Sequence, residues 1–159
     1  MRGLLLLWFG RRGADAFEQL ADEYRSRIAR FLPIAEQRLR PAAGRGGDRA
    51  STLAREAEQV RRRLRADDQL VALDEGGRQL TTSQLSAFLV EATGRGRVVF
   101  VVGSDLGLAG ELRREALLEL ALSRLTLPHQ LARVVLLEQL YRALDLAAGG
   151  PYHRAGTKN

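Results

Sequence analysis

The sequence predicts an α/β domain in which one parallel sheet carries helices on both faces. Short apolar runs alternate along the chain with segments of helical periodicity. The run from Val98 to Val102 is apolar at every position, which is typical of a central parallel strand covered on both faces. Because 159 residues suit one domain, we take residues 1–159 as a single unit.

The first strand and helix are expected near the N-terminus. Residues 3–9 are apolar, but the run is short, has no small-residue cleavage site and leads into Arg11 and Arg12. It therefore predicts a buried strand rather than a signal peptide. Asp15 and Glu18 have the spacing of a capping box at the start of the first helix.

The second strand and helix flank a basic loop. Residues 33–40 alternate loosely and predict a strand, and residues 41–50 predict a loop rich in glycine and arginine. The helix that follows should bury a stripe made of Leu53, Ala57, Val60 and Leu64.

The middle of the chain predicts a third strand and helix. Residues 69–74 form the strand, after which Gly76 and Gly77 should turn the chain. Thr81 and Gln84 have capping-box spacing, and Gly94 should end the helix. Its apolar stripe would be Leu85, Phe88, Leu89 and Ala92.

The last third contains a glycine-rich turn and two further helices. The turn spans residues 103–107, and a short helix is expected over 109–117. Residues 119–125 are ambiguous between strand and helix. The final helix should start near Pro128, where a missing N–H does no harm, and run to about residue 147.

Composition excludes several kinds of site. The chain has no cysteine, which removes disulfides, thiolate metal sites and cysteine nucleophiles, and its two histidines are too few for an ordinary metal site. No apolar run approaches the roughly 20 residues that span a bilayer, so we expect a cytoplasmic protein without a membrane partner. The formal charge is +6, and Lys158 is the one lysine among 25 basic residues. Arginine excess suits a nucleic-acid partner, although a genome rich in G and C produces it too.

Ligands of open α/β sheets bind at the carboxyl ends of the strands. Here those ends carry Leu73 and Asp74, and the turn at residues 103–107. Such turns are common in α/β proteins, so they are a weak signal. The pattern G-x-G-x-x-G does not follow the first strand, which disfavours a standard dinucleotide site.

Two later stretches carry polar groups suited to RNA. His129 and Arg133 are four residues apart and share a helix face, which could grip a phosphate or a base; a solvated helix start is the alternative. Glu138 and Arg142 have the spacing of an ordinary helical ion pair. The residues at 151–154, Pro-Tyr-His-Arg, offer stacking, proton transfer and anion contact, although C-terminal residues are often idle.

Together, the string Leu-Ser-Arg-Leu-Thr-Leu-Pro-His at 122–129 and Pro-Tyr-His-Arg at 151–154 closely resemble the RlmH family of SPOUT-class methyltransferases. The resemblance covers nearly the whole chain. It implies a SPOUT α/β-knot fold, with a C-terminal trefoil knot, that acts as a homodimer without metal. It implies S-adenosylmethionine as cofactor, contacted by Leu73, Gly103, Leu122, Ser123, Arg124, Leu125, Thr126 and Leu127.

The resemblance also implies a reaction: methylation at N3 of a pseudouridine in 23S rRNA, in a stem-loop at the subunit interface of assembled ribosomes. His129 or His153 would accept the N3 proton, Arg154 would stabilise negative charge on the base, and Tyr152 would stack on the base. In a dimer, the tail of one subunit could complete the site of the other.

The chain departs from the family pattern in its glycine-rich turn. The family has a second glycine where Ser104 stands and an acidic residue where Leu106 stands. Two alternatives therefore stay open: an RNA-binding or ribosome-assembly factor without catalysis, and a methyltransferase for another RNA position, such as a ribose 2′-hydroxyl.

Overall fold

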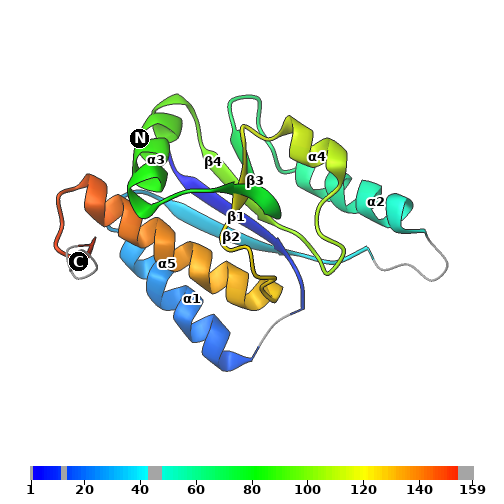
Figure 1. Cartoon of the computed structure of the whole chain (residues 1–159), viewed down its shortest axis with the longest axis horizontal. Coiled ribbons are helices and arrows are strands. Elements are labelled where there is room, and N and C mark those ends of the chain that lie inside the picture. The colour runs from blue at the N-terminus through cyan, green and yellow to red at the C-terminus, as the bar shows by residue number, and fades with distance from the viewer. Residues whose placement is uncertain (1, 12–13, 43–47, 154–159) are drawn as a thin grey trace.

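The computed structural model describes residues 2–11, 14–42 and 48–153. Five parallel strands form one sheet in the order β2-β1-β4-β3-β5 (Figure 1). The strands are β1 (Leu4–Phe9), β2 (Ile34–Leu39), β3 (Gln69–Gln79), β4 (Val98–Val102) and β5 (Leu118–Ala121). The segment that was ambiguous in sequence is thus a strand over its first residues.

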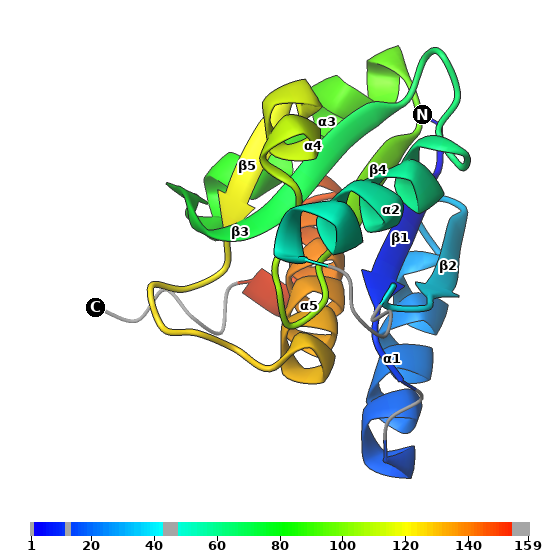
Figure 2. The same ribbon diagram turned by 90° about the vertical axis from the view of Figure 1, so that its right-hand side faces the viewer.

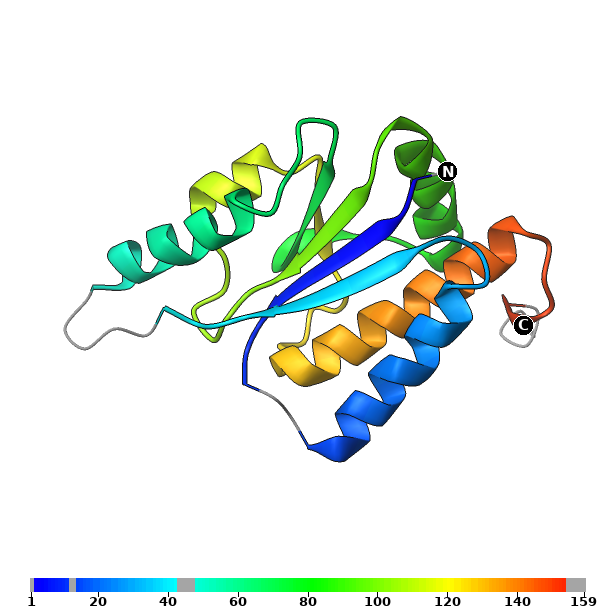
Figure 3. The ribbon, with the colours of Figure 1, turned by 180° about the vertical axis from the view of Figure 1, so that it is seen from behind.

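Helices cover both faces of the sheet, as predicted (Figures 1, 2 and 3). One face carries α1 (Asp15–Ile28), α3 (Thr82–Arg95) and α5 (His129–Ala147), and the other carries α2 (Arg49–Arg61) and α4 (Gly110–Glu115). The connections from β1 to β2 and from β3 to β4 cross the sheet in one direction and contain α1 and α3. The connections from β2 to β3 and from β4 to β5 cross it in the opposite direction and contain α2 and α4. All four crossovers therefore have the same hand, as parallel sheets require.

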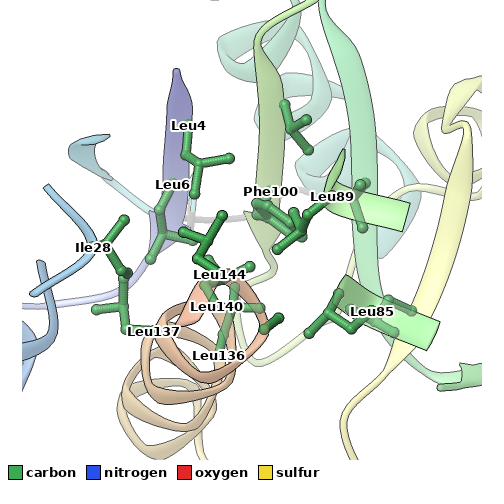
Figure 4. Packing of buried hydrophobic residues seen from close by; sticks show 14 of the residues in the cluster. Leu4, Leu6, Ile28, Leu85, Leu89, Phe100, Leu136, Leu137, Leu140 and Leu144 are labelled. Carbon is green, nitrogen blue, oxygen red and sulfur yellow. The ribbon is translucent and has the colours of Figure 1, made fainter. Parts of the chain in front are cut away.

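Burial on both faces explains the unbroken apolar runs. In β1, Leu4, Leu6 and Trp8 enter the core beneath α1, α3 and α5, whereas Leu5, Leu7 and Phe9 enter the core beneath α2 and α4. The strand β4 alternates in the same way and is fully buried, which confirms the prediction for Val98 to Val102. Figure 4 shows leucines of α5 packed against side chains of β1 and β4.

Several local predictions are corrected. The capping box at the first helix is wrong, because the N-cap is Ala14 and no side chain caps it; Asp15 and Glu18 lie in the first turn instead. Gly94 lies inside α3, which continues to Arg95. The capping box of Thr81 and Gln84 is confirmed.

The glycines after the third strand do not turn the chain away from the sheet. The strand β3 continues to Gln79, with a register shift between Leu73 and Arg78 where it pairs with β5. A Cβ on Gly77 would lie 2.7 Å from the Glu119 carbonyl oxygen, so glycine permits this close approach of the two strands. The irregularity therefore lies beside the carboxyl ends of the strands.

The predicted stripe of the second helix is partly wrong. Ala57 and Val60 are buried, but Leu53 is half-buried and Leu64 lies beyond the end of α2. Thr52 and Glu56 occupy the buried face instead. Among the described residues, no helix is both long and apolar enough to cross a membrane. The C-terminal knot and the extent of the single domain stay predictions.

Candidate functional site

A cavity of about 570 Å³ opens at the carboxyl ends of β3, β4 and β5. This is the edge where parallel sheets bind their ligands. The walls come from three chain segments: the end of the regular part of β3, the loop after β4, and the segment that joins β5 to α5. The floor includes the apolar side chains Leu73, Val102, Leu120, Leu122 and Leu127.

The loop after β4, residues 103–107, is folded tightly on itself; we call it the Gly loop. The Gly107 N–H donates to the Ser104 carbonyl oxygen at 2.8 Å, and Gly107 has a φ of 76°. A Cβ on Gly103 would lie 2.5 Å from the Gly107 carbonyl oxygen. Both glycines are therefore required, one for a left-handed conformation and one for close backbone approach.

The segment at residues 122–128 presents polar backbone to the cavity. It has no regular secondary structure, and Leu125 is 76% exposed. Within the described chain, backbone groups of residues 124–127 make no hydrogen bond to other backbone groups; the Leu125 N–H donates to the Ser123 hydroxyl at 2.9 Å. The Thr126 hydroxyl donates to the Glu75 carboxylate at 2.7 Å, which joins this segment to β3. Free amides and carbonyls at a cavity wall are suited to reading a heterocyclic base.

His129 begins α5 at the mouth of the same cavity. Its Nδ1 lies 3.4 Å from a carboxylate oxygen of Asp105, and its side chain is partly exposed. Pro128 precedes it as the N-cap, with extended backbone. The site thus contains one imidazole beside the Gly loop.

The structure brings most of the predicted site residues together. Those that line the cavity are Leu73, Gly103, Leu122, Ser123, Leu125, Thr126, Leu127 and His129. Arg124 does not line it; its Nε donates to the Gln79 side chain at 3.2 Å. Arg49 and Glu75 also line the cavity. The sequence placed Arg49 in a basic loop but not at the site, and it gave no signal for Glu75.

Tyr152 and His153 lie away from this cavity. They follow α5, whereas His129 begins it, and neither lines the cavity. The chain after α5 folds back along the helix, so that the Tyr152 hydroxyl reaches Glu138 in the middle of α5. Figures 1 and 3 show the two ends of α5 on opposite sides of the molecule. Arg154 lies outside the described residues. Within one subunit, Tyr152 and His153 therefore do not join the cavity.

Tyr152 follows α5 and packs back along it. Its hydroxyl donates to Glu138 at 3.2 Å, and its backbone N–H donates to Asp145 at 2.9 Å. Burial and the nearby Glu138 carboxylate raise the pKa of Tyr152. The predicted pair of Glu138 and Arg142 is confirmed at 2.6 Å. Tyr152 accordingly stays a neutral phenol at physiological pH.

Arg133 is not an exposed partner of His129, contrary to the sequence-based prediction. It is 2% exposed, forms ion pairs with Glu18 and Glu36, and lies over the Trp8 ring. Burial opposes its charge, but the hydrogen bonds to both carboxylates outweigh that effect and raise the pKa of Arg133. Arg133 therefore stabilises the packing of α5 and cannot grip a phosphate.

Metal chemistry has no candidate ligand set in residues 2–11, 14–42 and 48–153. No group of three or more histidine, cysteine, aspartate or glutamate side chains is placed to hold an ion there. The cavity is lined by apolar side chains, by backbone groups without backbone partners, by a small number of charged side chains and by one histidine.

Comparisons with known proteins agree on one family. Residues 3–153 match the family described as "Predicted SPOUT methyltransferase". The chain is 36% identical over 155 residues to the ribosomal RNA large subunit methyltransferase H of Maridesulfovibrio salexigens, covering 96% of this chain and 99% of that one. It is 38% identical over 154 residues to the protein of the same name from Geobacter metallireducens, with coverage of 96% and 99%.

A similar solved structure is that of the SpoU methyltransferase AviRb from Streptomyces viridochromogenes in complex with the cofactor AdoMet. The TM-score is 0.49 at 13% sequence identity, over 94% of this chain and 59% of that chain.

Proposed function

The chain belongs to the SPOUT methyltransferase family, alongside the ribosomal RNA large subunit methyltransferases H, and we propose that it transfers a methyl group from S-adenosylmethionine to N3 of a pseudouridine in 23S rRNA. The observation that carries the proposal is the cavity built from three segments at the carboxyl ends of β3, β4 and β5. A ribosomal substrate would place the protein in the cytoplasm.

The residues present fit the proposed methyl donor. Apart from the Leu125 N–H, the backbone groups of residues 124–127 have no hydrogen-bond partner within the described chain and can bind the adenine edge. Leu73, Leu122 and Leu127 supply apolar contact for the ring. Leu125, Thr126, Ser123 and Gly103 complete the wall around it. When bound, S-adenosylmethionine supplies a sulfonium-activated methyl group, so the protein needs mainly to position the base and remove one proton.

His129 is the group placed to handle that proton. It lines the cavity, and its Nδ1 lies 3.4 Å from a carboxylate oxygen of Asp105, which can orient the imidazole. Tyr152, His153 and Arg154 are proposed to act on the base: Tyr152 by stacking, His153 as an alternative proton acceptor and Arg154 by stabilising charge on the base carbonyls.

Because Tyr152 and His153 do not line the cavity of their own subunit, the proposal requires a homodimer in which each tail serves the partner's cavity. Mixed dimers test this. A Gly103→Ala chain supplies an intact tail, and a His153→Ala/Arg154→Ala chain supplies an intact cavity. Mixing two such inactive proteins should restore roughly a quarter of the wild-type rate, because half the dimers are mixed and each contains one intact site. No recovery after subunit exchange would contradict action across the dimer.

The rRNA partner is supported by exposed arginines along the same edge of the molecule. Arg11, Arg38, Arg40 and Arg55 have no carboxylate partner among the described residues, and Arg49 lies at the cavity. Arg11 follows β1, and Arg38 and Arg40 lie at the carboxyl end of β2, while Arg49 and Arg55 belong to α2. We call these five residues the arginine row. Their unpaired charge suits an RNA phosphate backbone.

The test uses ribosomes from cells that lack their own enzyme for this modification. The chain is incubated with S-adenosylmethionine carrying a labelled methyl group, and the rRNA is mapped by mass spectrometry. The proposal predicts label at N3 of one pseudouridine, and none when that position is an unmodified uridine. Label on a ribose hydroxyl would change the target, and no label despite donor binding would favour an RNA-binding factor without catalysis.

A further inference from the structure

Glu56 is a buried carboxylate that the proposed reaction does not use. It is 3% exposed and lies on the buried face of α2, next to Ala57 and Val60. Among the described residues no cation forms an ion pair with it. Since an unpaired buried carboxylate is costly unless hydrogen bonds satisfy it, its neutral partners are informative.

The two oxygens of Glu56 bind two different loops. Oε1 accepts the backbone N–H of Ala42 at 3.1 Å, just after β2, and Oε2 accepts the Ser104 hydroxyl at 2.9 Å, in the Gly loop after β4. In the sheet, β1 separates β2 from β4. The Glu56 side chain thus joins two loops that the sheet itself does not connect.

The Gly loop depends on such contacts for its shape. The Ser104 Oγ that donates to Glu56 also accepts the Leu106 N–H at 3.4 Å, and the Leu106 carbonyl accepts the Arg49 guanidinium at 3.0 Å. None of residues 103–107 has a buried side chain. Its conformation is therefore set by glycine geometry and by these hydrogen bonds, two of which come from α2.

We propose that Glu56 is a positioning residue for the methyl donor, which acts through Ser104 to hold the Gly loop in its binding shape. The inference rests on the proposed function, because it takes the Gly loop as part of the donor site. It also gives Ser104 a role: the hydroxyl found where the related family has glycine is the group that Glu56 holds.

A double-mutant cycle tests the inference. The dissociation constant of S-adenosylmethionine is measured by calorimetry for wild type, Glu56→Ala, Ser104→Ala and the double variant, together with each melting temperature. Loss of a hydrogen bond to a charged group is expected to weaken donor binding roughly tenfold in Glu56→Ala and several-fold in Ser104→Ala. The double variant should bind the donor no more weakly than Glu56→Ala, because both substitutions remove the same hydrogen bond between Ser104 and Glu56.

Two further variants separate positioning from mere stability. Glu56→Gln keeps an acceptor for Ala42 and a polar group for Ser104, so it should bind the donor within about threefold of wild type. Glu58→Ala is the matched control, since Glu58 is exposed on the same helix and pairs with Arg62. In the methylation assay, Glu56→Ala should raise the KM for the donor while kcat at saturating donor is nearly unchanged.

The contradicting results are distinct. If Glu56→Ala and Ser104→Ala lower the melting temperature but bind the donor as wild type does, Glu56 is only structural. If Glu56→Ala does not fold, Ser104→Ala decides alone, because Ser104 is only half-buried. A wild-type chain that produces no heat with S-adenosylmethionine overturns the proposed function, and this inference with it.

Discussion

Single residues of α5 show how burial decides between similar side chains. His129 and Arg133 lie one helical turn apart, yet His129 lines the cavity and Arg133 is enclosed by Glu18, Glu36 and Trp8. The i, i+4 spacing predicts a shared face, but that face runs from the cavity mouth into the protein within one turn. Polar residues on a helix can thus belong to a site or to the core.

Replacing Arg133 should cost stability without direct loss of donor binding. Arg133→Ala removes the ion pairs to Glu18 and Glu36 and leaves the buried Glu36 carboxylate with Arg25 as its remaining partner. We therefore expect the free energy of unfolding to fall by about 2–4 kcal/mol, measured by urea denaturation. Arg62→Ala breaks an exposed pair with Glu58 and should change it by less than about 0.5 kcal/mol. If both variants lost the same free energy of unfolding, the buried ion pairs of Arg133 would add no stability beyond that of an exposed pair.

Gly103 tests the shape of the donor site. A Cβ there would meet the Gly107 carbonyl oxygen at 2.5 Å, so Gly103→Ala must open the Gly loop and should weaken S-adenosylmethionine binding at least about tenfold in calorimetry. Gly94→Ala is the control, because Gly94 is exposed in α3 and a Cβ there meets nothing within 4 Å. It should raise the free energy of unfolding by about 0.5–1 kcal/mol and leave donor binding unchanged.

At the scale of elements, hydrophobic periodicity predicted the strands and helices of the described chain to within a few residues, apart from β3, whose length it missed, and β5, which it left ambiguous between strand and helix. The extension of β3 past Gly76 and Gly77 depends on pairing with β5, a partner about 40 residues away that no local pattern reveals. The burial of Glu56 could not be predicted for the same reason, since glutamate in a helix normally indicates a solvent-facing position. Tertiary contacts, not local propensity, decide both cases.

One ion pair fixes the amino ends of two neighbouring strands. Asp68 precedes β3 and accepts the Arg97 guanidinium at 2.6 Å, and Arg97 precedes β4. Burial raises the pKa of Asp68, but the hydrogen bonds from Arg97 and Arg65 outweigh it, so the net pKa is lowered from 3.8. A lowered carboxyl pKa stabilises the fold above that value and loses this contribution as the pH falls through the lower, folded value.

Asp68→Asn should therefore lower the free energy of unfolding by about 2 kcal/mol at neutral pH. The difference from wild type should shrink as the pH falls from 3.8 through the lower, folded pKa of Asp68, because the unfolded chain binds the proton first and the folded carboxyl binds it only below that value. Urea denaturation of both proteins across this range measures it. A difference that stays constant with pH would contradict the assigned ion pair.

At the scale of the molecule, the arginine row extends the cavity edge toward β2. If the arginine row contacts rRNA phosphates, the double variant Arg38→Gln/Arg40→Gln should bind ribosomes more weakly. The slope of its log binding constant against log salt concentration should also fall by the amount expected for about one to two lost phosphate contacts. Arg95→Gln is the control, because Arg95 ends α3 and pairs with Glu91. An unchanged salt slope in the double variant would place the rRNA elsewhere.

Sequence patterns predict the arrangement of the whole molecule least well. Alternating strands and helices predicted the layered fold, and the specific strings at 122–129 and 151–154 predicted the family. Neither pattern shows that Tyr152 and His153 follow the far end of α5 and stay outside the cavity that His129 lines. That separation depends on the direction of α5, and it makes the dimer a requirement of the proposed site rather than a family expectation alone.

The most direct test of the account is a crystal structure of the chain with S-adenosylmethionine. It should show the adenine against the backbone of residues 124–127, the Gly loop closed around the donor, and Tyr152 and Arg154 of the partner subunit near the methyl group. A donor bound elsewhere, or tails that reach neither cavity of the dimer, would contradict it.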